Sequence, residues 1–123
     1  MLDSNVLIDL ITGRRARGRL LKQLVEEGHS LGCCAIQITE IFAGMREEER
    51  SLTEALLASL DYYEVTRQAA RQGGLWKRNY HRKGRSLSLA DVTIAAVTLQ
   101  NNMVLITDNR KDYPMPELRL FTA

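Results

Sequence analysis

The sequence predicts an α/β domain with a central, mostly parallel sheet, because short apolar runs of strand length alternate with longer segments of helical periodicity. Parallel neighbours need helical crossovers, so this alternation favours a sheet flanked by helices on both faces, in three layers. The chain has 123 residues, no internal repeat and no linker, which indicates a single domain over residues 1–123 with a hydrophobic core of its own.

The first half of the chain contains three helical segments and one strand-like run. Apolar residues recur at helical spacing in the first two segments, and Gly13 and Gly28 provide stop signals. The second helix is expected to turn Ala16, Leu20, Leu21, Leu24 and Val25 inward. The expected elements are helices over residues 4–11, 14–27 and 38–45 and a strand over residues 31–36.

The second half continues the alternation. The first helix is expected to turn Leu52, Leu56, Leu57 and Leu60 inward, whereas the last is apolar nearly all round and is expected to be buried on more than one side. The strands are rich in β-branched and apolar residues. The expected elements are helices over residues 47–60, 66–83 and 89–99, strands over 62–65, 103–107 and 118–121, and a turn or short helix over 108–113.

Charge is distributed unevenly although the net charge is only +2. Residues 10–25 and 66–90 are both rich in Lys and Arg and contain no acid. Such segments suit a polyanion held near a metal, although each alone is also typical of a solvated helix face. Trp76 and Tyr80 lie four residues apart in the second segment, where they either stack on bases or pack inward.

The remaining composition is that of an ordinary soluble protein. No stretch approaches the roughly 18 apolar residues of a membrane span, and the N-terminus lacks the layout of a secretion signal, so a cytoplasmic location and no membrane partner are expected. Cys33 and Cys34 are adjacent within an apolar run and match no metal-ligand spacing. We expect them to be reduced and buried in a strand.

Four acids fall where open α/β sheets place their ligands. Asp3 and Asp108 each follow an apolar strand signal, while Glu40 and Asp91 lie in the N-terminal parts of helices. In a parallel sheet these positions meet at the carboxyl edge of the strands. Each acid alone has a simpler explanation: a helix cap for Asp3, a half-exposed helix residue for Glu40, a first-turn acid after Ser88 for Asp91, and a turn for Asp108.

Together, the four carboxylates would repel one another unless a cation lay between them. Oxygen ligands without Cys or His suit Mg²⁺ or Mn²⁺. Such ions activate water and stabilise a phosphoryl oxyanion, which needs no nucleophilic side chain. The residues therefore predict metal-assisted hydrolysis of a phosphodiester at Asp3, Glu40, Asp91 and Asp108.

In four places the chain resembles the PIN domain, and more narrowly the VapC-type toxins of bacterial and archaeal toxin–antitoxin pairs. The matching segments occur in the family's order and spacing, over nearly the whole chain. They are Leu-Asp-Ser-Asn-Val-Leu-Ile at residues 2–8, Thr-Glu-Ile at 39–41, Leu-Ala-Asp-Val-Thr-Ile-Ala-Ala at 89–96, and Leu-Ile-Thr-Asp-Asn at 105–109 with Lys-Asp-Tyr at 111–113.

This resemblance implies an endoribonuclease dependent on Mg²⁺ or Mn²⁺. In the family pattern Asp3 and Asp91 would be the direct metal ligands, Glu40 would complete the shell or position water, and Asp108 would be the most variable acid. Ser4 and Thr107 would support the site through hydroxyl hydrogen bonds. The resemblance also implies a homodimer and a cognate antitoxin whose C-terminal segment covers the pocket.

The sequence leaves open the identity of the fourth carboxylate and one competing function, and it disfavours two other kinds of acidic site. The last carboxylate is either Asp108 or Asp112, and we favour Asp108 because it follows the strand directly. A catalytically inactive PIN-fold module that binds RNA or an antitoxin is the competing function. A phosphoacceptor receiver is disfavoured because residues 62–65 supply no Asp, and an Asp-x-Asp phosphatase is excluded because Asn5 occupies the second position.

Overall fold

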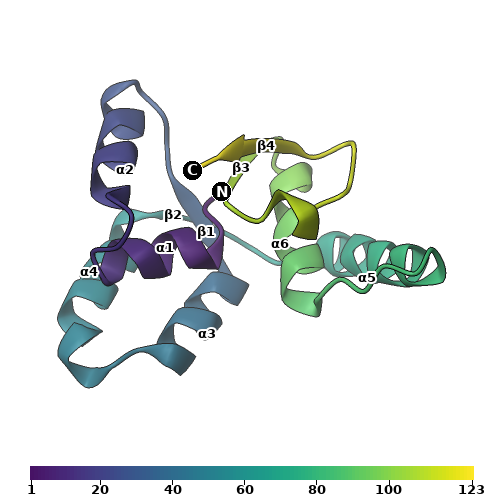
Figure 1. Cartoon of the computed structure of the whole chain (residues 1–123), viewed down its shortest axis with the longest axis horizontal. Coiled ribbons are helices and arrows are strands. Elements are labelled where there is room, and N and C mark those ends of the chain that lie inside the picture. The colour runs from purple at the N-terminus through teal and green to yellow at the C-terminus, as the bar shows by residue number, and fades with distance from the viewer.

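A parallel β-sheet runs through the middle of the computed structural model, which describes residues 1–123 (Figure 1). The strands are short and form two pairs, β1 with β2 and β3 with β4, both parallel as predicted. Their bounds are β1 Gly32–Cys34, β2 Asp61–Tyr63, β3 Val104–Thr107 and β4 Arg119–Thr122.

The N-terminal residues join the two strand pairs. The backbone N–H of Leu2 donates to the carbonyl of Gly32 in β1 at 3.0 Å, and the N–H of Asp3 donates to the carbonyl of Ile106 in β3 at 3.0 Å. Leu2 also forms a parallel bridge with Ile106. The order across the sheet is therefore β2, β1, the N-terminal residues, β3 and β4, which puts Asp3 at the centre of the carboxyl edge.

All predicted helices form, with ends that differ by a few residues. The largest difference is at the predicted strand over 31–36, because β1 stops at Cys34 and the next helix starts at Ala35. The Oε1 atom of Gln37 accepts the Cys34 N–H at 3.0 Å, which caps this helix early. None of the helices is both long enough and apolar enough to traverse a lipid bilayer. The bounds are α1 Ser4–Ile11, α2 Arg17–Glu26, α3 Ala35–Gly44, α4 Arg50–Ser59, α5 Arg67–Arg82 and α6 Leu89–Gln100, with 3₁₀ turns at Glu47–Glu49 and Arg110–Asp112.

Helices cover the sheet on both sides, which confirms the three-layer prediction. Successive strand residues alternate between two cores: Cys34 and Leu105 pack on the side of α5 and α6, whereas Cys33 and Ile106 pack on the side of α1, α2 and α3. Both cysteines are free and buried, as expected. Helix α6 buries six residues between Val92 and Thr98, consistent with its apolar sequence.

The inward faces predicted for two helices are wrong at one edge. Val25 in α2 and Leu52 in α4 are each 56% exposed, and Ala16, which directly precedes α2, is exposed too. A polar residue of each helix is buried instead. The buried position is Arg17 in α2 and Thr53 in α4. The inward face of each helix follows an i, i+3, i+4, i+7 pattern that starts at this buried polar residue. Hydropathy alone does not select a polar side chain as part of an inward face.

Candidate active site

Asp3 is the most enclosed carboxylate of the site. It is 5% exposed and caps α1 by accepting the Ser4 N–H on Oδ1 at 2.8 Å, so the simpler role of a helix cap is confirmed. Its Oδ2 atom accepts the hydroxyl of Thr107 at 2.7 Å, and Oδ1 accepts the hydroxyl of Tyr113 at 3.0 Å. Three donors from different elements therefore fix one carboxylate at the carboxyl edge of the sheet.

Asp91 meets Asp3 at the same tyrosine. Ser88 caps α6 by accepting the N–H of Asp91 at 3.0 Å, and the Oδ1 atom of Asp91 lies 3.1 Å from the Tyr113 hydroxyl oxygen. A hydroxyl carries one proton, so Tyr113 donates to only one of the two carboxylates at a time. The other contact places two acceptors face to face, which is a position that a cation or a proton stabilises.

The electrostatics of the pair agree with this geometry. Burial raises the pKa of Asp91, and repulsion from Asp3 and Asp112 raises it further, against the hydrogen bonds from Ser88 and Tyr113. Burial, together with the negative charges of Asp3 and Asp91, also raises the pKa of Tyr113. Tyr113 is therefore a neutral donor at physiological pH, and it holds the two carboxylates close without neutralising them.

Glu40 reaches the site through Ser4. It lies on α3 with an exposed side chain, and its Oε1 atom accepts the Ser4 hydroxyl at 2.6 Å. The hydrogen bonds expected from the hydroxyls of Ser4 and Thr107 are thus confirmed. Tyr113 links Asp3 to Asp91 through its hydroxyl, and Ser4 links Glu40 to Asp3 by donating its hydroxyl to Glu40 and its backbone N–H to Asp3.

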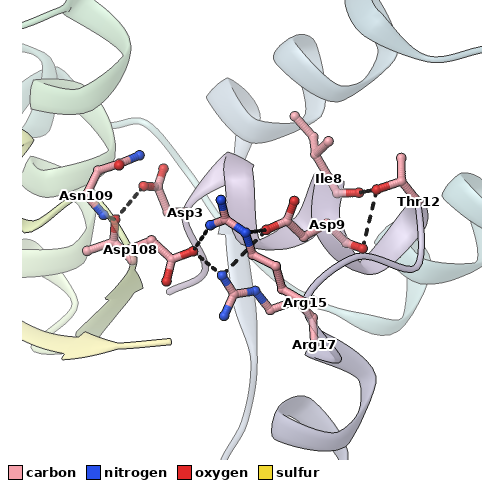
Figure 2. Close-up of polar contacts among 9 residues, drawn as sticks. Asp3, Ile8, Asp9, Thr12, Arg15, Arg17, Asp108 and Asn109 are labelled. Carbon is pink, nitrogen blue, oxygen red and sulfur yellow. Dashed lines mark hydrogen bonds and ion pairs between the residues drawn. The ribbon is translucent and has the colours of Figure 1, made fainter.

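Asp108 is turned toward a different partner. Its Oδ2 atom accepts from Nη1 of Arg15 at 2.9 Å and from Nη2 of Arg17, and the same two guanidinium groups also approach Asp9 (Figure 2). The structure does not join Asp108 to Asp3 or Asp91 by a shared contact, whereas Asp112 lies close enough to raise the pKa of Asp91. Which of Asp108 and Asp112 completes the site stays a prediction.

Of the two arginines that engage Asp108, Arg15 lies in the loop between α1 and α2 and Arg17 is the first residue of α2. Arg15 and Ala16 both have positive φ, 56° and 52°, a backbone region that non-glycine residues rarely adopt. This kink directs Arg15 and Arg17 back toward the end of β3. Arg17 is 5% exposed and its Nε atom has no partner, whereas the side chain of Arg15 is 66% exposed.

Two residues of the site were not singled out from the sequence. Tyr113 stood only within the Lys-Asp-Tyr segment, where nothing local indicates that its hydroxyl returns to Asp3. Gln37 is fully buried and donates from Nε2 to the carbonyl of Leu2 at 2.9 Å, which ties α3 to the central strand. No signal in the sequence indicated this role, because Gln37 falls between the predicted strand over 31–36 and the predicted helix over 38–45.

The donor set fits a hydrated hard cation. No group of three or more His, Cys, Asp or Glu side chains is arranged as a full set of metal ligands. Asp3 and Asp91 nevertheless converge on one hydroxyl, separated by no more than two hydrogen-bond lengths. Mg²⁺ typically binds through one or two carboxylates and keeps several waters, so this pair suits it.

Comparison with known proteins gives one family and several relatives. The family model described as PIN domain matches residues 1–114. Ribonuclease VapC19 of Mycobacterium tuberculosis is 30% identical over 120 residues, which cover 97% of this chain and 96% of the relative.

Solved structures agree at the level of the fold. A chain of the VapBC2 structure from Rickettsia felis, bound to a DNA fragment from its promoter, superposes with a TM-score of 0.87 at 21% identity, covering 100% of this chain and 97% of that one. A chain of a toxin–antitoxin complex from Klebsiella pneumoniae gives a TM-score of 0.74 at 26% identity, covering 95% and 92%.

Proposed function

This chain belongs to the PIN domain family, and on that premise we propose that it is a divalent-metal-dependent endoribonuclease of the VapC toxin type. The observation that carries the proposal is the meeting of Asp3 and Asp91 at the hydroxyl of Tyr113. The name of the relative VapC19 supports ribonuclease activity. The reaction is hydrolysis of an RNA phosphodiester by water.

Each residue of the site has a separate role in the proposed reaction. Asp3 and Asp91 would hold Mg²⁺ or Mn²⁺, which when bound supplies an activated water and stabilises the developing phosphoryl oxyanion. Tyr113 and Thr107 hold Asp3 in place, so the carboxylate does not reorient when substrate binds. Glu40, held by Ser4 at the exposed rim of the site, orients the attacking water and accepts its proton.

The test is cleavage of a fluorogenic RNA by the purified protein with Mg²⁺ or Mn²⁺ and in EDTA. We expect cleavage only with metal, and we expect Asp3→Asn and Asp91→Asn to reduce it by at least 10³-fold, on the scale of losing a major charge-stabilising group. Circular dichroism checks that both variants stay folded. Wild-type activity in folded Asp91→Asn protein would refute the assignment.

One observation favours a second candidate, a PIN-fold module that binds RNA or an antitoxin without cleaving. The Asp108 carboxylate, which sequence reasoning assigned to the catalytic set, is engaged by Arg15 and Arg17. The same assay separates the two functions. A binding module retains RNA in a gel-shift experiment at every metal concentration and releases no cleaved product.

We further propose a cognate antitoxin and a homodimer as partners. The toxin–antitoxin complex from Klebsiella pneumoniae, a chain of which shares the fold at 26% identity, supports an antitoxin for this chain. Co-expression with the product of an adjacent gene, followed by light scattering, measures both states. A monomer alone in solution and no complex on co-expression would contradict these two partners.

A further inference from the structure

A groove outside the acidic site runs along the outer face of α5. Its volume is about 590 Å³, and only one of its lining residues is hydrophobic. Helix α5 extends away from the sheet at the end of the molecule opposite α2 (Figure 1). The lining residues are Gly74, Lys77, Arg78, His81, Arg82, Ser86 and Leu89.

The charges of this groove are free to meet a ligand. Residues 66–90 contain no acid, and neither Arg78 nor Arg82 takes part in any ion pair. The aromatic residues of the helix face the other way, because Trp76 is buried and the hydroxyl of Tyr80 donates to the carbonyl of Pro114 at 3.2 Å. The outer face therefore offers cations, and stacking by Trp76 is excluded.

Two basic side chains, Lys77 in the groove and Arg85 beside it, donate hydrogen bonds that hold the walls of the groove. Lys77 donates from Nζ to the carbonyl of Leu87, and Arg85 donates to the carbonyl of Lys111. The first bond ties the loop between α5 and α6 to α5, and the second ties it to the 3₁₀ turn that precedes Tyr113. Leu89, 66% exposed on the rim, belongs to the first turn of α6, the same turn that carries Asp91 of the acidic site.

Two adjacent glycines in the middle of α5 differ in their reason for being there. A Cβ at Gly73 would come within 3.1 Å of the carbonyl oxygen of Val92, so close packing of α5 on α6 favours glycine. A Cβ at Gly74 would meet nothing within 4 Å. Glycine weakens a helix interior, and packing gives no reason for it at Gly74. Its position in the groove does, because a long side chain there would fill the floor of the groove.

We propose that this groove binds the phosphate backbone of the RNA strand on one side of the scissile bond. The inference rests on the proposed ribonuclease function and adds the path of its substrate. Arg78 and Arg82 are one helical turn apart, an axial step of about 6 Å, comparable to the step between successive phosphates. Together with His81 and the remaining donors of Lys77 they contact at least two phosphates, while Asp91 faces the bond to be cut.

The experiment measures RNA affinity in EDTA, so that binding is separated from cleavage. Arg78→Ala/Arg82→Ala is compared with Arg19→Ala/Lys22→Ala, which removes the same charge from exposed positions of α2. We expect the groove variant to bind a 20-nucleotide RNA about 10- to 100-fold more weakly than wild type at 100 mM salt. For the groove variant, the slope of log affinity against log salt should become shallower by about 1.4. The control variant should keep the wild-type slope, and its RNA affinity should change by no more than about twofold.

Cleavage then distinguishes the two proposals. With metal, the groove variant should raise KM on the 20-mer with little change in kcat, and it should cut a dinucleotide as fast as wild type does. Absence of cleavage by every form refutes the ribonuclease and leaves the affinity comparison standing. If the groove and control variants bind RNA with equal affinity, the proposed RNA path is wrong. This holds even if only the groove variant loses affinity for a poly-glutamate peptide, because the groove would then bind an acidic peptide and not RNA.

Gly74 gives an independent arm that leaves every cation in place. Gly74→Ala should raise Tm, because alanine favours the helix, and should keep RNA affinity within about twofold. Gly74→Glu should fold, since the position opens to solvent, and should weaken RNA binding at least tenfold. Full affinity in folded Gly74→Glu protein would overturn the proposed path.

Discussion

The two acid-free basic segments of this chain lie at opposite ends of the molecule and use their charge differently (Figure 1). At the start of α2, Arg15 and Arg17 are bound to Asp9 and Asp108. On α5, Arg78 and Arg82 have no acidic partner. A basic run in a sequence therefore indicates positive charge, but only the fold decides whether that charge is available to a ligand.

The cause is what the chain brings near each segment. Asp9 belongs to the preceding helix and Asp108 arrives from the end of β3, so both acids reach the α2 segment only after folding. A guanidinium as buried as Arg17 needs such partners, because an unpaired buried charge is costly. The cations of α5 stay in solvent and need none. We infer that α2 contributes its arginines to stability and α5 contributes its own to binding.

Removing Arg17 should give the largest effect on stability. Arg17→Ala leaves Asp108 and Asp9 partly buried without their closest cation, and we expect a loss of about 3 kcal/mol in the free energy of unfolding. Urea denaturation measures it. Arg15→Ala, at an exposed ion pair, should lose less than about 1 kcal/mol. Arg78→Ala should be neutral, and an equally large loss there would break the contrast between the two segments.

Two Asp→Asn variants should change stability in opposite directions. Asp108→Asn weakens a carboxylate paired with Arg15 and Arg17, so we expect a loss of about 2 kcal/mol. Asp91→Asn removes repulsion from Asp3, and we expect a gain of about 1 kcal/mol in metal-free buffer, or about 4 °C in Tm. Differential scanning fluorimetry checks both.

The same measurement with Mn²⁺ tests what Asp91 is for. The wild-type protein should gain Tm as Mn²⁺ is added, since a ligand that binds only the folded state stabilises it. Asp91→Asn should lose this gain, whereas Asp108→Asn should keep it. A loss of the Mn²⁺ response in Asp108→Asn would instead place Asp108 among the metal ligands.

The sequence predicted what depends on local pattern and missed what depends on distant pairing. Strands and helices followed from apolar periodicity, and Asp3 and Asp91 followed from their places at strand and helix ends. The burial of Arg17 did not, because it requires Asp9 and Asp108 to converge on it in space. The partnership of Tyr113 with both carboxylates was hidden for the same reason.

Arg17 and Thr53 make a second, smaller comparison, because each is a polar residue that begins an inward helix face. Arg17 has acidic partners, but the hydroxyl of Thr53 is fully buried with no hydrogen-bond partner. Thr53→Val keeps the shape and removes the unsatisfied group, so we expect a gain of about 1 kcal/mol in unfolding free energy. Urea denaturation checks it beside Arg17→Ala. If Thr53→Val instead lowers the free energy of unfolding, the Thr53 hydroxyl is hydrogen-bonded in solution. The buried polar residue would then stabilise the fold in both helices.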